Sequence, residues 1–89
     1  MEFEWDEAKA AANARKHHVA FPIATRVFLD EHRLEWLDTR RSYGEPRWIT
    51  IGLVEDIEIV VAYTVRGETV RMISARKAER HEREDYWKR

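Results

Sequence analysis

The segment RWITIGLVEDIEIVVAYTVRGETVRMIS, residues 47–74, decides the fold of this 89-residue chain. Residues 47–54, 57–65 and 69–74 are rich in β-branched and aromatic side chains, and only two or three residues separate these stretches. Connections this short join antiparallel neighbours, because parallel strands need crossovers of a dozen residues or more. Gly67 supplies the positive φ that a tight hairpin turn requires. The segment therefore predicts three antiparallel strands, with the most apolar one, 57–65, in the centre.

The flanking sequence adds one strand and three helices. Residues 33–37 alternate between polar and apolar, which predicts a fourth strand, and residues 38–46 form a polar loop. Residues 7–16 are alanine-rich and follow Asp6, a good N-cap, and Pro22 suits the first turn of a second, short helix. Residues 75–88 predict a C-terminal helix that Ser74 caps. In the strand before this helix, the side chains of Val70, Met72 and Ser74 are expected on one face. We expect a single α+β domain over residues 1–89: two N-terminal helices, an antiparallel sheet of about four strands and a C-terminal helix.

Several classes of site and location are excluded by composition. The chain has no cysteine, so disulfides and thiolate metal sites are ruled out. The adjacent His17 and His18 point in different directions on a helix, so we interpret them as a helix end and expect no metal. No Gly-rich phosphate loop is present, and we expect no cofactor. The N-terminus lacks a signal-peptide pattern and no apolar run approaches the ~20 residues that span a bilayer, which predicts a cytoplasmic protein without membrane contact.

The net charge of −1 hides an asymmetry along the chain. From Arg66 to Arg89 there are eight positive and five negative side chains, so this tail carries +3 and the remainder −4. On the predicted helix Arg76, Arg80 and Arg83 would line one face, and Arg71 would project toward it from the last strand. Guanidinium groups are suited to phosphate, but mixed charges at this spacing also fit a solvated helix face held by ion pairs. Both interpretations stay open on charge and spacing alone.

The same tail contains the types of group that metal-free RNA cleavage needs. That reaction requires a base for the 2′-hydroxyl, an acid for the leaving oxygen and cations for the phosphorane. Glu82, Tyr86 and His81 are candidates for proton transfer, with Glu82 and Tyr86 four residues apart as a pair. Arg71 and Arg76 are candidates for charge stabilisation. Without further information, a solvated helix face is the favoured interpretation.

Four sequence blocks in register favour the catalytic interpretation of this tail over the solvated helix face. They are Phe3-Glu4-Trp5-Asp6 with Lys9; Asn13 with Lys16-His17; Gly44-Glu45 with Arg47-Trp48; and Arg71 with Ile73-Ser74-Ala75-Arg76-Lys77-Ala78, then Glu82 and Tyr86. From about Phe3 to Tyr86 the chain resembles the BrnT family of toxins. It departs from the family at His18, where a glycine is usual. If that position needs a left-handed backbone, His18 must adopt it.

The resemblance implies a RelE-like fold and a type II toxin that cleaves RNA without a metal and inhibits translation and growth. It also implies a BrnA-type antitoxin, which is a ribbon-helix-helix-like DNA-binding protein. The toxin would contact operator DNA only through this antitoxin, and two toxin chains would form a dimer within a heterotetramer. The substrate would be RNA, including RNA that is bound to the ribosome. The residues implied for catalysis are Lys9, Arg71, Arg76, Glu82 and Tyr86; those expected to bind RNA are Arg47, Lys77, Arg80 and Arg83. The alternative is a non-catalytic binding module whose basic C-terminal surface docks an antitoxin or another protein.

Overall fold

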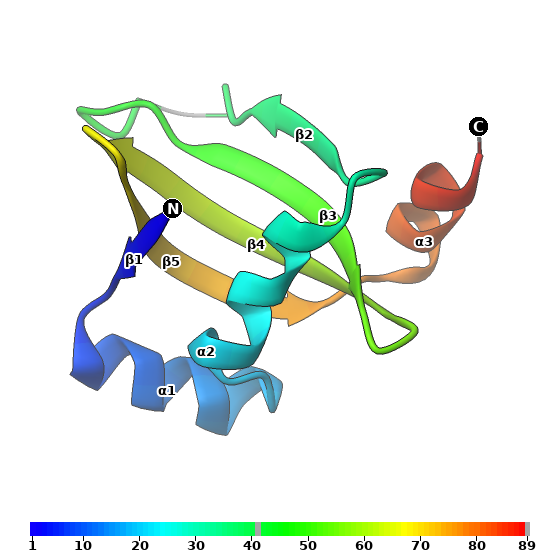
Figure 1. Ribbon diagram of the computed structural model, residues 1–89, viewed down its shortest axis with the longest axis horizontal. Helices are drawn as coiled ribbons and strands as arrows, with labels where there is room; N and C mark the ends of the chain where they lie inside the picture. The colour runs from blue at the N-terminus through cyan, green and yellow to red at the C-terminus, as the bar shows by residue number, and fades with distance from the viewer. Residues whose placement is uncertain (41, 89) are drawn as a thin grey trace.

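The computed structural model describes residues 1–40 and 42–88, so Arg41 of the polar loop and Arg89 of the basic tail lie outside the described residues. A five-stranded sheet is covered on one face by helices, and a further helix stands at one end of it (Figure 1). In chain order the elements are β1 (Glu2–Glu4), α1 (Glu7–His17), α2 (Phe21–Ala24), the 3₁₀ helix η1 (Thr25–Leu29), β2 (Leu34–Leu37), β3 (Trp48–Val54), β4 (Ile57–Arg66), β5 (Thr69–Lys77) and α3 (Arg80–Trp87). The predicted α+β class is confirmed.

The sheet has one strand more than predicted. Its order is β1-β5-β4-β3-β2, and β2 to β5 are antiparallel as expected. The additional strand, β1, pairs in parallel with β5, with Glu4 beside Arg71. The prediction of about four strands, all antiparallel, was therefore wrong. Three residues are too few to show an alternating pattern, and β1 exists only because β5 offers it an edge.

The C-terminal helix begins later than predicted. Residues 75–77 continue β5 and pair with Ile59–Val61 of the long strand β4, and α3 starts at Arg80. Ser74 is therefore not its cap. Glu79 takes that place in a capping box with Glu82. Because ladder hydrogen bonds to β4 hold residues 75–77 extended, Arg76 does not share a helix face with Arg80 and Arg83.

A β-bulge decides which side chains of β5 face the helices. Tyr63 of β4 pairs with Met72 and Ala62 pairs with Ser74, so Ile73 is the extra residue. After the bulge Ala75 faces the helices with Val70 and Met72, whereas Ser74 does not, which corrects its predicted position. The bulge thus places Arg76 on the opposite side of the sheet, which we call the open face.

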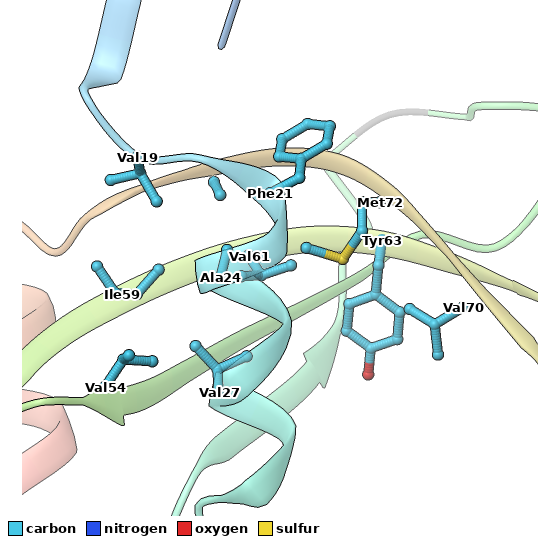
Figure 2. Packing of buried hydrophobic residues seen from close by; sticks show 11 residues of the cluster. Val19, Phe21, Ala24, Val27, Val54, Ile59, Val61, Tyr63, Val70 and Met72 are labelled. Atoms are coloured by element: carbon cyan, nitrogen blue, oxygen red, sulfur yellow. The ribbon is translucent and has the colours of Figure 1, made fainter. Parts of the chain in front are cut away.

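The main core lies between the sheet and the helices α1, α2 and η1. Phe21, Ala24 and Val27 from the helical layer meet Ile59 and Val61 from β4 and further strand residues (Figure 2). On the open face a smaller cluster is buried where α3 covers one end of the sheet, and it consists of Ile49, Ile51, Val60, Ala78 and Tyr86. Among the described residues, no other helix lies over the open face (Figure 1).

Both ends of α1 agree with the sequence prediction. Asp6 caps the helix by accepting a hydrogen bond from the backbone N–H of Lys9 at 3.0 Å. His17 ends it, and His18 takes the left-handed conformation with φ 58° and ψ 31°. His18 therefore adopts the conformation for which glycine is favoured. None of the helices in residues 1–40 and 42–88 has the length and apolar content to cross a bilayer.

Candidate functional site

Cationic side chains gather at the end of the open face where β4 turns into β5. Arg71 of β5 lies between Glu4 of β1 and Thr64 of β4 in the sheet register. Arg47, directly before β3, lines the same hollow of about 210 Å³ as Arg71 and Thr64. We call this hollow the basic pocket and define it by its charged lining residues, Asp6, Lys9, Glu45, Arg47, Arg66 and Arg71.

The basic pocket has more positive groups than its carboxylates occupy. Arg66 binds Glu45 at 3.0 Å, and Arg71 reaches Glu4 at 3.6 Å. Within the described part of the chain, Lys9 forms no ion pair. Arg47 forms none there either, and its guanidinium lies 4.0 Å from the ring centre of Tyr43. The pocket can therefore neutralise an incoming anion, and a phosphate suits the fork geometry of arginine.

Three segments that are distant in the sequence meet at this pocket for identifiable reasons. Parallel pairing of β1 with β5 brings Glu4, and beyond it Lys9, to Arg71. The loop before β3 is held down by Thr64, whose hydroxyl donates to the carbonyl of Pro46 at 2.7 Å, and by the Arg66–Glu45 pair. In Figure 1 this loop lies beside the β4–β5 turn. Parts of three of the four sequence blocks thus form one site.

The carboxylate of Glu45 is held in its charged form. The hydrogen bond from Arg66, supported by the nearby charges of Arg66, Arg47 and Arg71, lowers the pKa of Glu45 below its ordinary value. An ionised carboxylate can accept a proton from a bound hydroxyl, although the same lowered pKa makes it a weaker base. The pocket therefore combines anion binding with a proton acceptor.

Arg76 and Glu82 belong to a different place on the open face. The Arg76 guanidinium donates to both carboxylate oxygens of Glu82, at 2.7 and 2.9 Å, and Glu82 also accepts the backbone N–H of Glu79 at 2.8 Å. The pair ties α3 to β5, and its hydrogen bonds lower the pKa of Glu82 and raise that of Arg76. In the register with β4, Arg71 lies beside Thr64 and Arg76 beside Val60, four positions apart and therefore roughly 14 Å along the strand. The prediction that Arg71 projects toward the C-terminal helix was wrong.

A hollow of about 240 Å³ lies beside the Arg76–Glu82 pair. We call it the Trp36 cleft, and it is lined by Trp36, Leu37, Asp38, Thr39, Arg40, Ile49, Val60, Arg76 and Glu82. Here Arg40 donates to both oxygens of the Asp38 carboxylate at 2.9 Å, while its own side chain is 78% exposed. Sequence reasoning named none of Trp36, Asp38 and Arg40 as a catalytic or RNA-binding residue, because nothing in the sequence connects them to β5.

The remaining predicted residues lie away from the basic pocket. Tyr86 is buried and its hydroxyl donates to the carboxylate of Asp30, so the predicted pairing of Tyr86 with Glu82 was wrong. Arg80 is exposed and binds Glu84 at 3.1 Å. Arg83 donates to the carbonyl of Ala78 at 2.9 Å, and Lys77 is exposed at the end of β5. The predicted site residues are therefore divided: Lys9, Arg47 and Arg71 converge, and those from Lys77 onward do not join them.

Three charged members of the basic pocket, Asp6, Glu45 and Arg66, were missed as site residues. Asp6 was predicted only as the cap of α1, and Glu45 stood in a quoted block, so its neighbourhood with Arg47 carried a signal. Arg66 is the last residue of β4 and had no sequence signal, because only the fold brings it to Glu45. Among residues 1–40 and 42–88, no group of three or more His, Asp or Glu side chains is arranged to hold a metal ion.

Comparison with known proteins gives one clear result. A family model described as the ribonuclease toxin BrnT of type II toxin–antitoxin systems matches residues 5–82. The match includes Lys9, Arg47, Arg66 and Arg71 and ends at Glu82, before Tyr86. No curated protein matches the chain. Because the family model covers most of the 89 residues, the chain belongs to the BrnT family of ribonuclease toxins of type II toxin–antitoxin systems.

Proposed function

We propose that the basic pocket binds the scissile phosphate of RNA and that the chain cleaves RNA there without a metal ion. The observation that carries the proposal is the convergence of Lys9, Arg47 and Arg71 from three separate sequence blocks on one hollow. Two of these cations form no ion pair within the described residues, so they are available to a ligand. The sheet with one open, cation-lined face also fits the RelE-like fold that the sequence suggested.

The proposed reaction is an attack of the ribose 2′-oxygen on the adjacent phosphorus. Glu45 accepts the proton of the 2′-hydroxyl as the bond from that oxygen to phosphorus forms. Arg47 and Arg71 stabilise the extra negative charge of the phosphorane. Lys9 donates a proton to the 5′-oxygen as its bond to phosphorus breaks. The products are a 2′,3′-cyclic phosphate and a free 5′-hydroxyl, and Lys9 and Glu45 exchange protons with water to complete the cycle.

The proposal gives the C-terminal residues an anchoring role. Each terminal nitrogen of Arg76 donates one hydrogen bond to Glu82, and the Tyr86 hydroxyl donates to Asp30 in the interior. These contacts fix α3 on the end of the sheet. We therefore place Lys9, Arg47, Arg71 and Glu45 at the reacting phosphate, and Arg76, Glu82 and Tyr86 in the support of the surface around it.

In the cell this activity would act in the cytoplasm against translation and growth, and a BrnA-type antitoxin would neutralise it. This antitoxin would be a ribbon-helix-helix-like protein that binds operator DNA. The complete complex would be a heterotetramer that contains a toxin dimer. The net charge of −1 gives the free toxin little long-range attraction for bulk RNA. Cleavage should therefore fall as salt rises, unless another surface such as the ribosome delivers the RNA.

The test is cleavage of end-labelled RNA by the purified chain in excess chelator. Arg71→Ala and Lys9→Ala are expected to lower the rate by about 10²–10³, because each removes a charge partner of the transition state. Arg80→Ala and Lys16→Ala remove an exposed arginine and an exposed lysine elsewhere and are expected to retain the rate. Loss of cleavage by the unaltered chain in chelator would contradict metal independence.

The alternative is a binding module without catalysis. It predicts that RNA stays intact, both free and on translating ribosomes, in the presence of the folded chain. It also predicts that Arg71→Ala weakens antitoxin binding alone. An unaltered cleavage rate in folded Arg71→Ala would refute the basic pocket as the catalytic site.

A further inference from the structure

A third hollow lies between the Trp36 cleft and the basic pocket and shares lining residues with both. This middle hollow, of about 370 Å³, is lined by residues 37–39 and 42–47. It shares Leu37, Asp38 and Thr39 with the Trp36 cleft, and Glu45 and Arg47 with the basic pocket. We call the three neighbouring hollows, from Arg71 to Arg76, the groove.

Trp36 stands at the far end of this groove on the edge strand of the sheet. Its side chain faces the open side in a row with Ile49 and Ala62, and 42% of the residue is exposed. Ile49 and Val60 line the cleft beside this indole, so an apolar surface next to the ring is accessible to a ligand. An aromatic ring on a sheet face is a platform on which an unpaired base can stack.

The charges of the cleft favour a base over a phosphate. Arg40 is paired with Asp38 and Arg76 with Glu82, so these four groups contribute no net charge. Each guanidinium has five N–H donors and its carboxylate uses only two of them here. The cleft therefore offers an aromatic face with hydrogen-bonding edges, whereas the basic pocket at the other end offers unpaired positive charge.

We infer that the Trp36 cleft is a second subsite for single-stranded RNA, in which a base stacks on the indole of Trp36 while the cleaved phosphate lies in the basic pocket. This inference rests on the proposed function and extends it to a substrate class. Duplex RNA does not fit, because its bases are stacked on each other and cannot reach a side chain.

The distance between the two subsites sets the length of RNA that uses both. In the sheet register Trp36 is three strands and two residues away from Arg71. With about 4.8 Å between strands and about 3.4 Å per residue, the separation is roughly 16 Å. At about 3.4 Å per nucleotide of a stacked strand this corresponds to at most about five nucleotides, and an extended, unstacked strand spans it with fewer. A dinucleotide whose phosphate lies in the basic pocket therefore does not reach Trp36, and a decanucleotide does.

The experiment measures affinity for 2′-O-methyl RNA, which lacks the nucleophile and stays intact. Fluorescence anisotropy with a labelled decamer is compared for the unaltered chain, Trp36→Ala and Trp36→Phe. Trp36→Ala is expected to weaken decamer binding by about 5- to 100-fold, the usual effect of removing one stacking platform. Trp36→Phe keeps an aromatic face and is expected to stay within about threefold. The matched control is Trp87→Ala, since Trp87 is 60% exposed on α3 and outside the groove.

A labelled dinucleotide separates this inference from the proposed function. Trp36→Ala is expected to leave dinucleotide affinity unchanged, and Arg71→Ala to weaken both dinucleotide and decamer binding. Equal decamer affinity of Trp36→Ala and the unaltered chain overturns the second subsite, as does an equal loss for dinucleotide and decamer. Loss of antitoxin binding with RNA binding intact would make the cleft a protein interface and also overturn the inference. If Arg71→Ala binds both lengths normally, it is the proposed function that fails.

Discussion

The side chain of Asn13 is the most informative place to perturb this fold. Asn13 is buried in α1, and its amide donates to the carbonyls of Val19 at 3.1 Å and Ala75 at 2.8 Å. Its oxygen accepts the backbone N–H of Ala75 at 3.1 Å. One side chain thus fixes α1 against β5 two residues beyond the bulge. Lys9 lies one helical turn before Asn13, so the same contacts position Lys9 relative to Arg71.

The expected cost of Asn13→Ala follows from these three hydrogen bonds. Each contributes about 0.5–1.5 kcal/mol net, and their loss leaves buried backbone groups of Ala75 and Val19 unsatisfied. Alanine regains about 0.5 kcal/mol of helix propensity at this position. We therefore expect the free energy of unfolding to fall by about 2–4 kcal/mol. For a domain of this size, that lowers the midpoint of thermal unfolding by roughly 10–30 °C.

Thermal and urea unfolding followed by circular dichroism would measure this effect. Asn13→Asp keeps an acceptor for the Ala75 N–H but sets a carboxylate against two carbonyl oxygens, so we expect it to be no more stable than Asn13→Ala at neutral pH. Arg15→Ala, on the exposed side of the same helix, is expected to change stability by less than about 0.5 kcal/mol. If Asn13→Ala were as stable as Arg15→Ala, the contacts would not hold α1 in place and the reasoning would be refuted.

Three further predictions concern the fold around the site. His18→Gly is expected to gain about 0.5–1 kcal/mol, since φ 58° strains a residue with a side chain, and a higher urea midpoint would show it. Gly52→Ala should lose about 1–3 kcal/mol in thermal unfolding, because its Cβ would lie 2.8 Å from the Cβ and 2.9 Å from the carbonyl oxygen of Val27, and adding Val27→Ala should not restore the loss, since alanine keeps both atoms. Glu82→Gln should cost about 1 kcal/mol near pH 7, a modest value because Arg76 is one-third exposed. Since the folded pKa of Glu82 is lowered from 4.5, its contribution is complete above that pH and is lost as pH falls through the lowered value. A pH series of urea unfolding should therefore converge for Glu82→Gln and the unaltered chain in acid, and a constant difference would contradict the ion pair.

The sequence by itself determined the elements whose signal is local. The antiparallel strands β2 to β5, the helix α1 with its Asp6 cap and His18 end, and the tight turn at Gly67 all follow from side-chain periodicity and backbone preference. These features depend on neighbours a few residues apart, which is the range that a sequence pattern describes. The matching blocks also identified the family, although they could not say which of their residues lie together.

Only the tertiary structure decided which charged residues form a site. Arg71 and Arg76 are chemically equivalent in the sequence, yet a bulge and the length of β5 place one in the basic pocket and the other against Glu82. The run 75–77 has helical composition, but the edge of β4 supplied hydrogen bonds that a short helical turn could not match. Strand β1 likewise required an existing neighbour. Pairing and register join residues dozens of positions apart, and their energies depend on the partner strand, so no local pattern contains them.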